Sequence, residues 1–332
     1  MATLTETPLV RRGGENRIIG SNGRPLLIIV SGHEIDAMID AGMEAIGGLT
    51  RYLAGGKQVV LKPNTNQRDP FPSITDPATM RAVARHCQSA GVERIVVHED
   101  HKREMDLYYE PTELPGMEVL MSHSPTPENY VLVEHQKWHG DVDPHEAYAD
   151  LEPNGMLARL LEGDYPRTSG HQIRVARELQ EASFIINLPV LKRHFAGQIT
   201  SALKNHFGSV YGPHRWLAHV ALQKNRDYFD RKLVEFASAV RPELTITDVR
   251  SLQAVSGPGR GDETRIIEDV NKLIVTGDMV AADTVALKLM KDFDPSFTKT
   301  NEGIVLRQHQ HAEELGLGSG DLSKFEIIEV SV

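Results

Sequence analysis

Short apolar runs alternate with stretches of helical periodicity along the first 97 residues of the chain. The apolar runs lie at 25–30, 58–61 and 94–97, and each has the length of a β-strand. The stretches between them, 34–53 and 75–90, repeat apolar residues every three or four positions, as amphipathic helices do. Because a helix that follows a strand returns the chain for a parallel neighbour, this alternation predicts an α/β fold with a doubly wound, mainly parallel sheet.

The same rhythm divides the chain into parts. Between 98 and 170 it is lost, and the sequence is rich in Pro, Glu, Asp and His. A structureless loop of this length is uncommon in a compact domain, so we predict an inserted irregular subdomain or lid. The predicted parts are a mobile or loosely docked N-terminal arm (1–22), a first α/β half (23–97), the insertion (98–170) and a second α/β half (171–332). In the second half we expect helices at 172–181, 213–239, about 279–290 and near 301–315, and strands at 244–247, 272–276 and 325–330.

The stretch 183–212 predicts where the functional site lies. It opens with the buried-strand pattern Phe184–Ile186 and continues through Lys192, Arg193 and His194. Helical spacing begins at 197, and a glycine at 208 or 212 would end that helix. In an open α/β sheet, ligands bind at the loops that leave the carboxyl ends of strands, and a helix start adds N–H donors there. This strand, cationic turn and helix therefore predict a site for an anionic group.

The composition narrows the partners. A net charge of -10 over 332 residues argues against a nucleic-acid binder, because such proteins neutralise phosphates with a basic domain. The single cysteine, Cys87, excludes an internal disulfide framework and an iron–sulfur cluster held by cysteines of this chain. No apolar run reaches the roughly 18 residues that a membrane span needs. We expect a cytoplasmic protein with a small anionic molecule as its partner, no nucleic acid and no membrane, and we keep a homo-oligomer open.

Lysine and asparagine recur at the predicted strand exits. Because parallel strands place these loops at one edge of the sheet, distant loops can converge and hold a carboxylate or phosphate. Burial could also lower the pKa of a lysine enough for acid–base or Schiff-base chemistry. The alternative is that these are solvated surface lysines. The expected catalytic residues are Lys192, His194 and Lys204, and the expected substrate-binding residues are Lys62, Asn64, Asn187, Asn205, Gly257 and Gly259.

Histidine and acidic residues extend this set. His194 could act as general acid or base, whereas His206 lies on an apolar face and is expected in the core. Asp278 is expected as a helix N-cap. Asp248 and Asp283 could bind a divalent metal or orient a lysine. The glycine-rich loop 257–261 matches neither dinucleotide nor P-loop patterns, and a flexible turn explains it equally well.

The insertion also holds clusters of metal-ligand residue types. These residues could bind a metal ion, or they could simply form a solvated polar loop. We favour the loop, because the spacing of the residues does not place a second pair of ligands on one face of a helix or turn. The residues are His98, Glu99, Asp100, His101, His135, His139, Asp141, Asp143 and His145.

Several motifs together resemble one family, the domain of unknown function 362. They are Leu61–Asn64, Asn187–His194, Ser201–Gly208, the Asp248 strand exit, Gly257–Pro258 and Gly277–Asp283, in order along the chain. The resemblance implies that the shared positions include Lys62, Asn64, Lys192, His194, Lys204, Asn205 and Asp283. It implies no reaction. In many members of this family, the domain looks to be joined to a cysteine-rich ferredoxin segment or to an export signal. We expect neither segment in this chain. A remoter similarity is to lactate-racemase-type proteins, in which histidines and a lysine handle a 2-hydroxy acid.

Three functions remain open from the sequence. The first is an enzyme of isomerase, lyase or oxidoreductase type, with Lys62, Lys192 and Lys204 binding a small anion and His194 moving a proton. The second is a non-catalytic protein that binds a metabolite, cofactor or metal. The third is a redox or cofactor-maturation protein with an external iron–sulfur partner.

Overall fold

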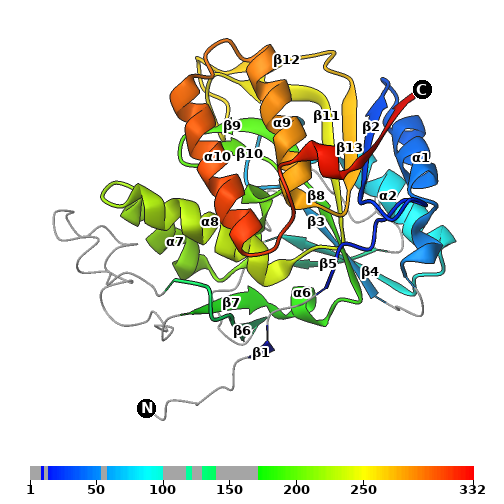
Figure 1. Ribbon diagram of the computed structural model, residues 1–332, viewed down its shortest axis with the longest axis horizontal. Helices are drawn as coiled ribbons and strands as arrows, with labels where there is room; N and C mark the ends of the chain where they lie inside the picture. Colours follow the sequence, from blue (N-terminus) through cyan, green and yellow to red (C-terminus); the bar gives the residue numbers. More distant parts are fainter. Residues whose placement is uncertain (1–8, 11–13, 54–57, 100–116, 122–128, 140–170) are drawn as a thin grey trace.

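A large, mainly parallel sheet forms the centre of the molecule (Figure 1). The computed structural model describes residues 9–10, 14–53, 58–99, 117–121, 129–139 and 171–332. Along the sheet the strands run in the order β14-β2-β13-β11-β8-β3-β4-β5. Of these, β13 alone is antiparallel to its neighbours β2 and β11, and the other pairs are parallel. The strands are β2 (Leu26–Ser31), β3 (Gln58–Pro63), β4 (Arg94–Glu99), β5 (Met117–Met121), β8 (Phe184–Leu188), β11 (Leu244–Ala254), β13 (Lys272–Thr276) and β14 (Glu326–Ser331).

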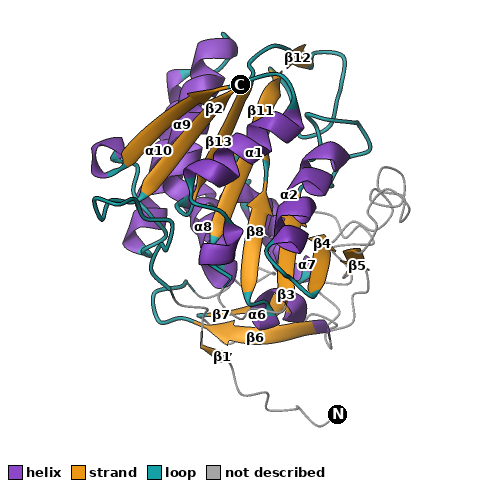
Figure 2. Ribbon diagram, turned by 90° about the vertical axis from the view of Figure 1, so that its right-hand side faces the viewer, coloured by secondary structure: helices purple, strands orange, loops and turns teal. Residues whose placement is uncertain are grey.

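Helices cover both faces of this sheet, as the doubly wound prediction requires. Helices α1 (Ile35–Ala45) and α2 (Pro77–Ser89) lie on one face, and α8 (Arg226–Val240), α9 (Met279–Phe293) and α10 (Lys299–Glu314) lie on the other (Figures 1 and 2). Strand residues alternate between the two cores. In β3, Val60 packs in the core of α8 and α9, while Val59 and Leu61 pack in the core of α1 and α2. The predicted α/β class is therefore confirmed.

A small second sheet lies beside the main one. It contains β1 (Leu9–Val10), β6 (Tyr130–Glu134) and β7 (Gln172–Ala176), in the order β1-β6-β7. Part of the predicted insertion thus contributes β5 to the edge of the main sheet and β6 to the small sheet; most of it lies outside the described residues. Of the predicted N-terminal arm, the described residue Ile18 is fully buried, and its carbonyl accepts from the N–H of Leu26.

The prediction of a helix that begins at 197 and ends at 208 or 212 is wrong. The chain instead forms a hairpin of β9 (Val190–His194) and β10 (Gln198–Thr200), followed by the short 3-10 helix η4 (Lys204–Ser209). His194 Nδ1 accepts from the N–H groups of Ala196 and Gly197, at 3.0 and 3.2 Å, and so closes the hairpin turn. The apolar residues with helical spacing are buried by tertiary contacts made from irregular backbone, which periodicity alone cannot distinguish from a helix.

Other boundaries differ for local reasons. The predicted helix 172–181 is β7 followed by the one-turn helix α6 (Arg177–Glu181). The predicted helix 213–239 is divided into α7 (Gly212–Ala221) and α8, because Asn225 caps α8 by accepting from the N–H of Tyr228 at 2.9 Å. The first predicted helix ends at Ala45 and is followed by η1 (Leu49–Arg51). The remaining elements are β12 (Arg265–Ile267), which pairs with the extended β11, and η5 (Leu322–Lys324).

Candidate active site

The exit loop of β3, the turn after β9 and the last residue of β4, Glu99, border a cavity of about 440 Å³ at the carboxyl edge of the sheet. Ligand sites of open α/β sheets lie at this edge, so the sequence-based location is supported by the described cavity. The walls come from both halves of the chain. The lining residues are Asn64, Asn66, Gln67, Glu99, His194, Phe195, Thr200, Lys204, Asn205, Phe207, Gly208, Arg215, Trp216, His219 and Pro258.

A buried ion pair lies beside the cavity. Lys62 Nζ donates to Glu99 Oε2 at 2.8 Å and to the carbonyl of Pro63 at 2.7 Å, and both charged side chains are buried. Gly208 lies against this pair: a Cβ there would be 2.0 Å from Glu99 Oε1. The close approach explains why glycine occupies the position. The pair holds the ends of β3 and β4 together.

Three asparagines connect the exits of β3 and β8. Asn64 Nδ2 donates to Asn205 Oδ1 at 2.9 Å, Asn205 Nδ2 donates to Asn187 Oδ1 at 2.8 Å, and Asn187 Nδ2 donates to the carbonyl of Ala202 at 3.1 Å. We call these three residues the amide chain. Its direction is fixed at both ends, because Lys192 only donates to Asn64 Oδ1 and the carbonyl of Ala202 only accepts.

Lys192 anchors the amide chain behind the cavity wall. Its Nζ donates to Asn64 Oδ1 at 3.1 Å, to Asn66 Oδ1 at 2.8 Å and to the carbonyl of Ser73. Burial lowers the pKa of Lys192 to about 7, while the charge of Glu99 raises it. Three acceptors favour the ammonium form, and none of the three N–H groups is left for a ligand. We therefore assign Lys192 a positioning role rather than the catalytic role expected from the sequence.

Lys204 is placed differently from the other two lysines. It lines the cavity, is only 6% exposed, and its Nζ lies 3.5 Å from the centroid of the Phe207 ring. Among the described residues no carboxylate lies within ion-pair distance of its ammonium group. Burial and the charges of Lys192 and Arg215 hold the pKa of Lys204 well below the usual 10.5. The neutral amine of Lys204 is thus easier to reach than that of a solvent-exposed lysine.

His194 lines the same cavity as a neutral ring. Burial, and then the charge of Lys204, hold the pKa of His194 well below 6.5. Since its Nδ1 accepts two backbone N–H bonds, the proton resides on Nε2. His219, on α7, has a pKa lowered to about 3 by burial and by Lys204. The ring of His194 therefore offers a hydrogen-bond donor to the cavity without adding charge.

The expected site residues fall into groups. Asn64, His194, Lys204 and Asn205 line the cavity. Lys62, Lys192 and Asn187 are buried and support these residues from behind.

The glycine-rich loop contributes Pro258 to the wall. A Cβ on Gly257 would be 2.0 Å from the carbonyl of Arg193, and one on Gly259 would be 2.7 Å from Gln67 Oε1. These glycines allow close packing of the loop.

The acidic residues have structural partners. Asp248 accepts from Thr79 Oγ1 at 2.8 Å and pairs with Arg250 at 2.9 Å. Asp283 accepts from the N–H groups of Ala202 and Leu203, and burial raises its pKa to about 6. The two carboxylates have separate partners, which does not support the expected metal pair.

Two further expectations concern single side chains. Asp278 caps α9 by accepting from the N–H of Ala281 at 2.8 Å, as predicted. His206 is buried in the core, as predicted, and burial holds its pKa well below 6.5.

The metal-like cluster of the insertion is only partly described. His98 is fully buried, and burial and the charge of Lys62 lower its pKa to about 4. His139 Nδ1 lies 2.8 Å from Glu235 Oε1. Asp100, His101, Asp141, Asp143 and His145 lie outside the described residues. Within the described ranges, no group of three or more His, Cys, Asp or Glu side chains could hold a metal ion.

Sequence reasoning missed part of the cavity wall. Arg215 and His219 are four residues apart on α7, and Trp216 and Phe195 complete the wall. Position at a strand exit could have identified Glu99 as a site residue. No local signal identifies the α7 residues, because only the packing of α7 brings them to the sheet edge.

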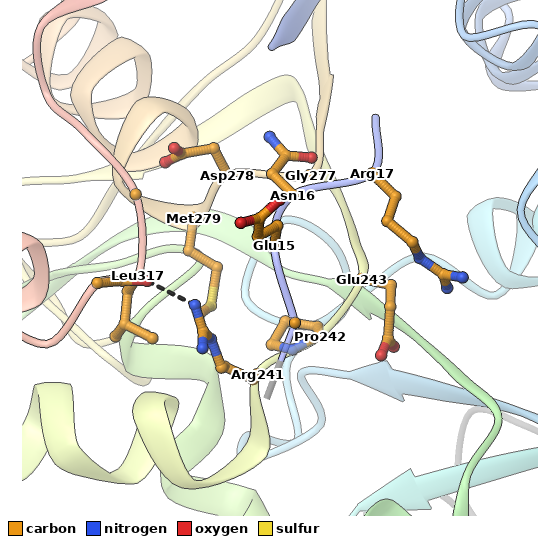
Figure 3. Close-up of a pocket in the computed structure, with 13 residues that line it drawn as sticks. Glu15, Asn16, Arg17, Arg241, Pro242, Glu243, Gly277, Asp278, Met279 and Leu317 are labelled. Atoms are coloured by element: carbon orange, nitrogen blue, oxygen red, sulfur yellow. Dashed lines mark hydrogen bonds between the residues drawn. The ribbon is translucent and has the colours of Figure 1, made fainter. Parts of the chain in front are cut away.

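A larger cavity, of about 1010 Å³, lies at the opposite, amino ends of β8 and β11 (Figure 3). Three of its charged side chains have hydrogen-bond partners within the fold, although the amide nitrogen of Asn16, which also lines it, has none. Arg241 donates to the carbonyl of Gly316 at 2.6 Å, Glu243 accepts from the N–H of Ile185 at 2.7 Å, and Asp278 accepts from two N–H groups. The cavity of about 440 Å³ is lined by Lys204, a buried lysine without a carboxylate partner among the described residues, and is therefore the better candidate for an active site.

Among the helices that the structure describes, none combines the length and the apolar character needed to cross a bilayer.

Comparisons with known proteins give few functional names. A thylakoid-associated protein of Synechocystis sp. (strain ATCC 27184 / PCC 6803 / Kazusa) is 27% identical over 272 residues, which cover 78% of this chain and 70% of that protein. A protein of Thermotoga maritima has a solved structure that is similar with a TM-score of 0.40 and 14% identity, over 84% of this chain. The lactate racemase apoprotein of Thermoanaerobacterium thermosaccharolyticum is similar with a TM-score of 0.42 and 11% identity, over 74% of this chain. The matches cover 58% and 54% of those two solved chains.

The family model gives a more direct result. Residues 153–288 match the model of the family described as Domain of unknown function (DUF362). This range contains the motifs from Asn187 to Asp283 on which the resemblance was based. The resemblance to the domain of unknown function 362 family is thereby confirmed over residues 153–288.

Proposed function

We propose that this protein is an enzyme that acts on a small anionic metabolite carrying a carboxylate or a phosphate. The observation that carries the proposal is Lys204, a buried cation that lines a cavity and has no carboxylate partner among the described residues. Burying an unpaired charge is costly, and an anionic ligand would offset that cost. Arg215 adds positive charge to the same cavity.

The proposed chemistry uses two groups. Lys204 binds the anionic group in its ammonium form; because its pKa is lowered, the same side chain can also lose its proton and then serve as a base or as an amine nucleophile toward a carbonyl. His194 serves as a neutral donor through Nε2–H, as it does not become protonated near neutral pH. Lys192, Lys62 and the amide chain hold these groups in place. Isomerisation, elimination and carbonyl chemistry all suit this pair.

Binding is tested first, with inorganic phosphate and a panel of small carboxylates as probes. We expect these anions to raise the melting temperature of the wild-type protein and to leave that of Lys204→Met unchanged. Lys288→Met is the matched control, because Lys288 is an exposed lysine on α9, and it should respond like the wild type. Equal stabilisation of Lys204→Met and the wild type by every anion would refute the proposal.

Turnover is tested second, because a carrier protein would also bind an anion. Native mass spectrometry of the purified protein identifies any anion that co-purifies, and incubation with that compound reveals a product. If the compound has a carbonyl, borohydride trapping followed by peptide mapping shows whether Lys204 forms a Schiff base. Stoichiometric binding without product would identify a non-catalytic binder.

We also propose a cytoplasmic location, because the lone cysteine of the chain, Cys87, is free and buried, so the fold needs no oxidising compartment. Because a relative is named as thylakoid-associated, cell fractionation is the appropriate test. Recovery in the membrane fraction would contradict this proposal.

A further inference from the structure

One wall of the candidate active site is aromatic. Phe195, Phe207, Trp216 and the rings of His194 and His219 all line the cavity. The rings contact one another: Phe195 stacks on His194 with centroids 4.9 Å apart and an interplanar angle of 20°, and Phe207 meets His219 edge to face at 5.1 Å. A site that binds only an anion does not need an aromatic wall, so the wall requires a separate explanation.

Phe195 is the most informative residue of this wall. It is 66% exposed, whereas its neighbours His194 and Ala196 are buried. The turn between β9 and β10 fixes its position, because His194 Nδ1 binds the N–H groups of Ala196 and Gly197. One face of the Phe195 ring rests on His194, and much of the rest is open. An aromatic ring that is held in place and uncovered beside a cavity is a platform on which another ring can stack.

The positive charge of the cavity lies next to this platform. Lys204 Nζ is over the face of Phe207, at 3.5 Å from the ring centroid, and Arg215 and Trp216 are adjacent on α7. The cavity volume of about 440 Å³ falls in the range of sites for ring-sized organic ligands, and is several times what a phosphate ion alone would fill. A ligand that uses the whole site therefore carries both an anionic group and a planar ring.

We propose that the site binds an aryl anion, with its carboxylate or phosphate at Lys204 and Arg215 and its ring against Phe195 and Trp216. This inference rests on the proposed anion site and specifies its substrate class. Its consequence is selectivity: an aromatic acid binds more tightly than an aliphatic acid of the same charge and size.

The test measures dissociation constants by calorimetry for two matched pairs of probes. Phenyl phosphate is compared with inorganic phosphate, and benzoate is compared with cyclohexanecarboxylate, which has similar bulk but no π face. We expect each aromatic probe to bind about tenfold more tightly than its partner, as ring stacking commonly contributes. Quenching of tryptophan fluorescence by phenyl phosphate, lost in Trp216→Leu, reports the ring contact directly, since Trp138 is buried elsewhere.

Variants assign the effect to the platform. Phe195→Leu keeps an apolar side chain but removes the π face, and we expect it to lower the affinity for phenyl phosphate about fivefold or more while leaving that for inorganic phosphate unchanged. Phe293→Leu is the control, because Phe293 is 37% exposed on α9 and does not line the cavity. Circular dichroism confirms that the variants fold.

The outcomes separate the two proposals. Phosphate binding that requires Lys204 but is not improved by a phenyl group would overturn the aryl specificity and leave the anion site standing. Equal affinities for benzoate and cyclohexanecarboxylate would also overturn it. If none of the four probes binds the wild type, both the anion site and its aryl specificity are refuted.

Discussion

Lys204 is a buried amine that lines the cavity, and its burial should lower the stability of the folded protein. Because its pKa in the folded protein is below 10.5, the unfolded chain binds more protons between these two values, and the buried amine destabilises the fold. The cost is complete below the folded pKa and disappears as the pH rises to 10.5. A residue that serves ligand binding here opposes folding in the empty protein.

Lys204→Met should therefore stabilise the protein in the absence of ligand. We expect a higher melting temperature at pH 7, by about 2–4 °C for each kcal/mol recovered, with a difference from wild type that shrinks toward pH 10.5. Urea unfolding from pH 6 to 10 measures the difference. Lys288→Met is the control. Because Lys288 is exposed on α9, its replacement should show no such pH dependence. A difference that is constant with pH would contradict the burial of a titrating amine.

Gly208→Ala should destabilise the protein by about 1–3 kcal/mol, because the added Cβ would overlap Glu99 Oε1 and separate Glu99 from Lys62. Gly303→Ala, within α10, meets no atom within 4 Å and should instead stabilise by about 0.5–1 kcal/mol. Chemical denaturation of both variants gives the comparison. Equal and small effects would show that the Glu99 side chain relocates without cost.

At the scale of elements, the segment from β8 to η4 shows what periodicity can and cannot predict. The strand pattern at Phe184 is specified locally, because β-branched and aromatic residues run together between two breaks. The apolar residues after 197 repeat at helical spacing for a different reason. They fill gaps between α8, β9 and the sheet, so their backbone follows tertiary contacts rather than local preference.

Helix α9 supports the site through one side chain. Asp283 binds the backbone N–H groups of Ala202 and Leu203, just before Lys204. Asp283→Asn replaces one acceptor oxygen with a donor, and should cost about 1–2 kcal/mol of stability and weaken phosphate binding. Asp292→Asn, exposed on the same helix, is the control for charge. Unchanged phosphate affinity in a destabilised Asp283→Asn protein would show that the loop holds its shape without this contact.

For the whole molecule, the parallel strands explain how much of the site the sequence could predict. Residues at the exits of β3 and β8, such as Lys62 and Asn187, are more than a hundred positions apart and still meet, because parallel strands end at one edge. Arg215 and His219 were not predictable in this way. Their position depends on how α7 packs against α8 and η4, and no short-range pattern encodes that packing.

The two cavities lie at opposite ends of the strands, so they should behave independently. Arg241→Leu removes the bond to the carbonyl of Gly316 and should lower stability without changing phosphate affinity. Combined with Lys204→Met, its effect on the free energy of unfolding should add to within about 0.5 kcal/mol. A double-mutant cycle by urea denaturation measures this sum. A larger interaction energy would mean that the sheet couples its two edges.

The one-way amide chain also limits how this protein can change. Because each asparagine must present its oxygen to one neighbour and its amide hydrogen to the next, reversing or removing any member leaves two buried groups unmatched. In a library that varies one position at a time, residues 64, 187 and 205 would look equally intolerant. Variation of all three together is the route by which a new polar arrangement, and with it a new ligand preference, becomes accessible.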